Sequence, residues 1–224
     1  MNELSKTKYS FISNTKNFVK ENIRIIVSIL AIIFFIYLCL QLFSYIKISN
    51  IKKDSIVFFD TLDLNDEEKL YKDLEPFLNK ENFYSILSSL KLINIDLKNN
   101  NHEEAKKKYI DILNKKNIDS DFRSIISANA AYNFLNIQFD NIALNYIDQI
   151  NYFIELIDDN KLNYKSIKYE LEYLIKILKL EKSNKDYKND NSIFDLVDEI
   201  LNSNDVSSNI KDRVKKIHDF QIHK

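Results

Sequence analysis

The sequence of 224 residues contains no glycine. A chain of this length usually has about fifteen. Motifs that need a residue without a Cβ are therefore excluded: the P-loop, the dinucleotide-binding G-x-G-x-x-G, the nucleophile elbow and the EF-hand. Two-residue β-hairpin turns also lose their best residue. The composition favours helices joined by short polar loops, with asparagine at the left-handed positions that helix ends require.

Charge and reactive side chains indicate neither a nucleic-acid-binding protein nor an enzyme. The 32 basic and 33 acidic residues are interleaved along the chain, so we expect no basic patch for nucleic acid. The histidines, His102, His218 and His223, lack the close spacing of zinc sites. The acid-rich segment 60–68 has leucines where a calcium loop needs oxygen ligands. We therefore predict no catalytic residue, no cofactor and no metal.

One apolar run stands near the N-terminus. Residues 25–46, IIVSILAIIFFIYLCLQLFSYI, carry no charge and lie between Arg24 and Lys47. As a helix the run is about 33 Å long, enough to cross a bilayer core of about 30 Å. A signal peptide has a shorter run and a small-residue cleavage site, so we predict an uncleaved transmembrane helix. The apolar side chains that represent this anchor are Ile25, Phe34, Phe35, Leu40 and Ile46.

The basic residues around the run predict its orientation. More of them precede it than follow it, which places the N-terminus in the cytoplasm. These residues are Lys6, Lys8, Lys16, Lys20 and Arg24 before the run, and Lys47, Lys52 and Lys53 after it. We expect a short cytoplasmic segment at 1–22, a transmembrane helix at 23–47 and a soluble domain at 48–224. In a bacterium with two membranes this is a single-pass inner-membrane protein with a periplasmic domain.

The soluble region has helical periodicity interrupted by polar breaks, which delimit about eight helices of ordinary length. Asn65 with Glu68 and Asn101 with Glu104 have the spacing of capping boxes, so helices should start near 66 and 102. Pro76 should kink or shorten the helix that contains it. The breaks are at 64–65, 79–81, 99–101, 117–121, 139–140, 158–161, 183–191 and 202–205.

Two stretches of the soluble region, 90–113 and 125–150, align with each other at an offset of 38 residues. This offset is close to the 34 residues of a tetratricopeptide repeat, a helix-turn-helix unit with a small residue where its helices cross. The aligned apolar pairs are Ala105 with Ala143, Leu97 with Leu135, and Ile112 with Ile150. Leu92 and Tyr109 occupy further packing positions of the first unit.

The predicted fold is all-α: one transmembrane helix followed by a tetratricopeptide-repeat-like stack of helical hairpins. A general helical bundle remains the alternative, because alanines at helical spacing suit any helical core. Residues 161–180 and 192–201 would form a third hairpin. Residues 205–220 would form a closing helix with one apolar face made of Val206, Ile210, Val214, Ile217 and Phe220. Ile93 and Ala131 stand where the repeat prefers glycine, so the first hairpin should be splayed relative to the consensus.

The layout resembles a known family, the membrane-anchored, tetratricopeptide-repeat-like ancillary subunits of the bacterial SecYEG translocon. The resemblance rests on the basic-aromatic segment 16–22 before the anchor, on FYSILSSLKLINIDLKNNNHEEA (83–105), on SANAAYNFLNIQFDNIALNYIDQI (127–150) and on the closing VSSNIKDRVKKIHDF. The glycine-rich turns of the family are missing here, and the loop of the third unit is longer. The resemblance implies a periplasmic domain that binds proteins near the translocon and its chaperones.

From these observations we expect a membrane-anchored protein-binding module rather than an enzyme. Its partners would be Sec translocon components, periplasmic chaperones or secreted clients, together with membrane lipid through one span and without nucleic acid. The partner-binding residues are not predicted, and homo-oligomerisation is left open. The alternative is a structural or scaffolding envelope protein that self-associates through its anchor.

Overall fold

The computed structural model describes residues 3–64, 66–116, 118–141 and 144–224, with side chains from Lys20 onward. These residues form helices and loops and contain no strand. The chain divides into two units, Met1–Leu62 and Asp63–Lys224. We call the second unit the helical domain.

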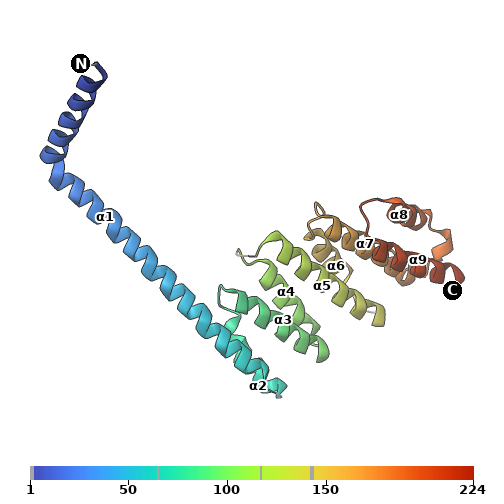
Figure 1. The fold of residues 1–224 in the computed structure, drawn as a ribbon. Coiled ribbons are helices and arrows are strands. Elements are labelled where there is room, and N and C mark those ends of the chain that lie inside the picture. Colours follow the sequence, from blue (N-terminus) through green and yellow to red (C-terminus); the bar gives the residue numbers. More distant parts are fainter. Residues whose placement is uncertain (1–2, 65, 117, 142–143) are drawn as a thin grey trace. The chain divides into compact units, whose positions relative to one another are not determined.

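The first unit consists of one helix, α1 (Glu3–Leu62), which is 60 residues long (Figure 1). It includes the whole apolar run, and it continues through residues 48–62, which lie beyond the predicted transmembrane helix at 23–47. The helix therefore has no break at the predicted boundary after residue 47, and the compact unit starts at Asp63.

The helical domain contains eight α-helices and two short 3₁₀ turns among its described residues. Each predicted break in the sequence falls at or beside a gap between helices. In chain order the elements are α2 (Glu67–Leu74), η1 (Glu75–Phe77), α3 (Phe83–Lys98), α4 (His102–Leu113), α5 (Ser120–Asp140), α6 (Ile147–Glu155), α7 (Leu162–Lys182), η2 (Tyr187–Asn189), α8 (Asn191–Asn202) and α9 (Ser208–His223).

The helices pack mainly against their neighbours in the sequence. α3 pairs with α4, α5 with α6 and α7 with α8, which forms three successive hairpins (Figure 1). The first two hairpins meet where α4 packs against α5, the next two where α5 and α6 pack against α7, and α7 also contacts the closing helix α9. One apolar core cluster is shared by α3 to α7, and a second by α7 to α9.

Most of the predicted packing residues lie inside this core. Leu97 is partly buried against the first cluster. The fully or almost fully buried ones are Leu92, Ala105, Tyr109, Ile112, Leu135 and Ile150. Ala143 lies outside the described residues, and α6 begins only at Ile147. The first helices of the two aligned units differ in length, since α5 has 21 residues and α3 has 16. The pairing of Ala105 with Ala143 stays a prediction.

Ile93 was expected to widen the first hairpin. It is 1% exposed and shares the first core cluster with the fully buried Ala105. Ser88 and Ser89 of α3 are also buried, so this helix supplies other small side chains. The core is thus closed around Ile93, and the helix spacing relative to a consensus repeat stays a prediction.

Asparagine replaces glycine at two helix ends, as expected. Asn100 and Asn184, with φ of 59° and 49°, are the non-glycine residues with positive φ among those described. After α3, the N–H of Asn101 donates to the carbonyl of Asp96, and that of Asn100 to the carbonyl of Leu97. Lys185 and Asn184 make the same pair of bonds after α7. Both ends are Schellman motifs, which satisfy carbonyls left unpaired at the end of a helix.

The predicted helix starts are confirmed, but not their caps. Asp66 caps α2, its side chain accepting from the N–H groups of Glu68 and Lys69; Asn65 lies outside the described residues. α4 begins at His102, yet the Asn101 side chain makes no capping bond. Asn101 already closes α3 through its own N–H, and its ψ of 58° is not the extended value typical of a capping residue.

Two further predictions concern the ends of the domain. α2 stops at Leu74, and Pro76 lies in the 3₁₀ turn that follows, so the proline shortens the helix as expected. The closing helix buries Ile210 and Val214, but Phe220 is 64% exposed. Ile222 packs against the second cluster in its place.

Candidate functional site

A buried serine recurs near the start of the first helix of each hairpin: Ser85 in α3, Ser124 in α5 and Ser166 in α7. These serines are 39 and 42 residues apart. The Ser124 hydroxyl accepts a hydrogen bond from the N–H of Asp158 at 3.0 Å, and the Ser166 hydroxyl accepts one from the N–H of Ser207 at 3.0 Å. In both hairpins, the backbone after the second helix is thereby fastened to the first helix.

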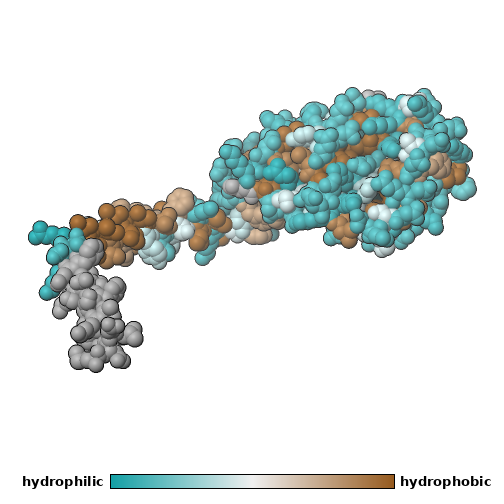
Figure 2. Space-filling model, turned by 90° about the horizontal axis from the view of Figure 1, so that it is seen from above, coloured by the Kyte–Doolittle hydropathy of each residue, from teal (hydrophilic) through white to brown (hydrophobic). Residues whose placement is uncertain are grey.

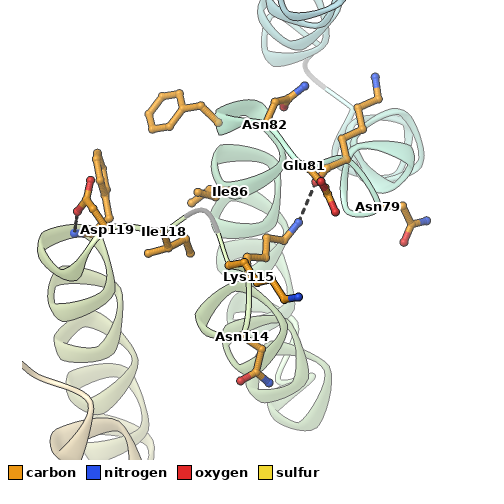
Figure 3. Close-up of a pocket in the computed structure, with 12 residues that line it drawn as sticks. Asn79, Glu81, Asn82, Ile86, Asn114, Lys115, Ile118 and Asp119 are labelled. Carbon is orange, nitrogen blue, oxygen red and sulfur yellow. Dashed lines mark hydrogen bonds between the residues drawn. The ribbon is translucent and has the colours of Figure 1, made fainter. Parts of the chain in front are cut away.

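The first hairpin departs from this arrangement. Ser85 is reached by a side chain, the ammonium of Lys115, instead of a backbone N–H. The same ammonium donates to the carbonyl oxygens of Leu78, at 2.9 Å, and Lys80, at 3.1 Å. Burial lowers the pKa of Lys115. Its side chain connects the end of α4 to the turn before α3, and a pocket lies beside this connection (Figure 3).

This pocket has a volume of about 610 Å³ and lies at the N-terminal ends of α3 and α5 and the C-terminal end of α4 (Figure 3). We call it the Phe83–Phe122 pocket. Its apolar lining consists of Phe83, Ile86, Ile118 and Phe122. Its polar lining consists of Asn79, Lys80, Glu81, Asn82, Asn114, Lys115, Lys116 and Asp119.

The two phenylalanines are exposed although they are large and apolar. Phe83 is 48% exposed and Phe122 is 43% exposed. Their ring centroids are 5.9 Å apart with an interplanar angle of 66°, an edge-to-face arrangement. Ile125, one turn further along α5, is 52% exposed. An exposed group of aromatic and aliphatic side chains at a pocket is typical of a protein interface, where aromatic residues are enriched.

The polar lining is slightly basic, with three lysines and two acids. The Asp119 carboxylate is engaged locally, because it accepts the N–H of Phe122 at 2.8 Å as the cap of α5 (Figure 3). The Lys80 ammonium lies 4.2 Å from the centroid of the Phe77 ring. Lys116 is exposed. The pocket thus combines exposed aromatic side chains with a slightly basic polar lining.

Other polar clusters of the helical domain join helices. The buried Glu170 of α7 accepts hydrogen bonds from Tyr132 of α5 and Arg213 of α9, both at 2.5 Å. Tyr187 bonds to Tyr173 of α7 at 3.1 Å and to the ring of His218 in α9 at 2.6 Å. No group of three or more His, Cys, Asp or Glu side chains that could hold a metal is found in the described part of the chain.

The second candidate functional element is the apolar part of α1. The predicted anchor side chains are 57% to 67% exposed, so they form the outer surface of the helix. Figure 2 shows mainly hydrophobic side chains on the surface of this stretch. Within the described residues, one helix is long and apolar enough to cross a membrane. Sequence reasoning found this element, but it did not single out Phe83, Phe122, Lys115 or the recurring serines.

Comparison of the chain with protein-family models, curated proteins and solved structures finds no match.

Proposed function

We propose that this protein is a single-pass inner-membrane protein whose helical domain, a tetratricopeptide-like stack, binds other proteins on the periplasmic side. The observation that carries the binding role is the exposed Phe83–Phe122 pair at a pocket with a slightly basic polar lining. The anchor would hold this pocket at the membrane and raise its effective concentration near membrane partners. By the resemblance of its layout, those partners are translocon components, periplasmic chaperones or secreted chains.

The stacked arrangement is supported by contacts that recur from hairpin to hairpin. Besides the buried serines, Asp121 in the first turn of α5 pairs with Lys161 before α7. Lys165 in the first turn of α7 pairs with Asp205 before α9 at 2.6 Å. The first pair joins α5 to the loop before α7, and the second joins α7 to the loop before α9, so the two pairs occupy equivalent places. Repeated contacts between neighbouring units are the expected basis of stability in a solenoid.

Site-specific photocrosslinking in intact cells tests the binding role. A photoreactive phenylalanine analogue is placed at Phe122 in one variant and at Phe220 in the matched control. Phe220 is 64% exposed in the same domain but lies in α9, away from the pocket. We expect translocon or chaperone components to be captured from position 122 and not from position 220. Identical products at both positions, or self-crosslinks alone, would contradict the proposal.

Membrane attachment and orientation are tested separately. The full chain should stay in the membrane fraction after alkaline carbonate extraction, because an uncharged, mostly apolar run of 22 residues would be in contact with lipid. A reporter that is active only in the periplasm should be active when fused to the C-terminus and silent at the N-terminus. The opposite pattern of activity would overturn the orientation.

A further inference from the structure

Three polar side chains in the apolar run of α1 lie on one face of the helix. Tyr37, Gln41 and Ser44 are spaced by four and three residues, which puts them on one stripe. All three are exposed. Cys39 and Ser28 lie on the other side of the helix. Cys39 is two residues after Tyr37, about half a turn, and Ser28 is nine residues before it, about two and a half turns. We call the three residues the polar stripe.

This inference rests on the proposed function, in which the run spans a bilayer. The depth of the polar stripe in that bilayer then decides whether its side chains meet water or lipid tails. Tyr37 lies within about 3 Å of the midpoint of residues 25–46, and Gln41 lies about 8 Å from it. Half of a hydrocarbon core is about 15 Å. Both polar groups are therefore surrounded by lipid tails, which cannot form hydrogen bonds.

Within the helix, the stripe satisfies only part of its hydrogen-bonding capacity. The Gln41 amide donates one N–H to the Tyr37 hydroxyl at 3.0 Å. A glutamine side chain has a second N–H and a carbonyl oxygen, and a tyrosine hydroxyl can also donate its own proton. The stripe thus offers donors, on Tyr37 and Gln41, and an acceptor, the Gln41 oxygen, toward the lipid.

We propose that a second copy of this chain pairs with α1 along the polar stripe, Tyr37–Gln41–Ser44, as a parallel dimer. All copies insert in the same direction, so Gln41 of each copy lies at the same depth. The stripe is complementary to itself: the Tyr37 hydroxyl and the Gln41 amide donate, and the Gln41 oxygen of the other copy accepts. A two-fold axis gives each contact twice. Polar side chains that bond across helices are a known source of association in membranes.

Disulfide crosslinking of the full chain in its native membrane tests this inference. The wild type, whose single cysteine is Cys39, is compared with Ser44→Cys in a Cys39→Ser background. After mild oxidation, we expect a covalent dimer from Cys at position 44 and almost none from Cys39, which lies on the opposite face. Equal crosslinking from both positions would overturn the dimer proposed here.

Gln41→Leu, made in the Ser44→Cys background, removes the amide and should weaken association about 10-fold. Ser28→Leu is the matched control, since Ser28 is polar but bonds to the Arg24 carbonyl of its own helix at 2.8 Å. It should leave crosslinking unchanged. Unchanged crosslinking in Gln41→Leu would refute the role of the stripe. A chain released by carbonate extraction would instead refute membrane anchoring itself, so the two failures can be told apart.

Discussion

Replacing Arg213 by methionine should destabilise the helical domain more than replacing Glu170 by glutamine, although both residues belong to one ion pair. The reason is their unequal burial. The Glu170 side chain is 4% exposed, and that of Arg213 is 56% exposed. Their atoms are 2.5 Å apart, and Tyr132 donates to the same carboxylate oxygen. The pair joins α7 to α9, with α5 attached through Tyr132.

The magnitudes follow from what each substitution leaves behind. Without Arg213, a buried carboxylate keeps the Tyr132 hydroxyl but loses its counter-charge. Breaking a buried pair in this way costs about 3–5 kcal/mol, and we expect about 3 because the guanidinium is half in water. In Glu170→Gln, the guanidinium turns to solvent and the amide oxygen still accepts from Tyr132, which costs about 1 kcal/mol.

The double variant Arg213→Met with Glu170→Leu makes the comparison decisive. Removing both charges leaves mainly an unpaired Tyr132 hydroxyl, at a cost of about 1 kcal/mol. It should therefore be more stable than Arg213→Met alone. The assay is urea unfolding of the full chain in mild detergent, followed by near-ultraviolet circular dichroism of the tyrosines. The reasoning is refuted if Glu170→Gln is less stable than Arg213→Met. It is also refuted if the stability lost in the double variant equals the sum of the losses from the single substitutions at the two positions.

Three further predictions concern other positions in the helical domain. Ser124→Ala leaves the N–H of Asp158 without its acceptor, so it should lower the free energy of unfolding by about 1–2 kcal/mol, measured by thermal unfolding. Ser120 is exposed in the same helix, and Ser120→Ala should change stability by less than about 0.5 kcal/mol. Equal losses in the two variants would contradict this. Burial raises the pKa of Tyr109 to about 12, so the folded state holds this proton more tightly than the unfolded chain, and the resulting stability is present below about pH 10 and lost as the pH rises toward 12. The free energy of unfolding, measured in urea across that pH range, should fall less steeply for Tyr109→Phe than for the wild type. An equally steep fall in both would contradict the raised pKa of Tyr109. At Asn100, with φ of 59°, glycine should be tolerated and valine should cost about 1–2 kcal/mol by thermal unfolding; similar melting temperatures for both variants would show that the left-handed position is unimportant.

Local features of the helical domain could be predicted because they depend on neighbouring residues. Helix ends follow from groups a few positions apart, so the polar breaks, the asparagine at position 100 and the proline at position 76 indicated them correctly. The caps of α2 and α4 were less predictable. Asn101 had the right spacing, but its backbone is held by the end of the preceding helix.

Contacts between distant segments could not be predicted in the same way. The alignment of 90–113 with 125–150 implies first helices of equal length, but α5 is longer than α3. Phe220 has the periodicity of a buried residue but lies outside the second core cluster. The repeated serines have no distinctive spacing along the sequence, because serine is also common in loops and helix starts.

The sequence by itself determined the long apolar helix, the helical class of the domain and the positions of its breaks. All three depend on composition and on periodicities of a few residues. Only the tertiary structure decided that Lys115 reaches back to Ser85, and that Phe83 and Phe122 meet at the surface. These contacts join residues 30 to 39 positions apart, and their distances are set by how helices α3, α4 and α5 pack.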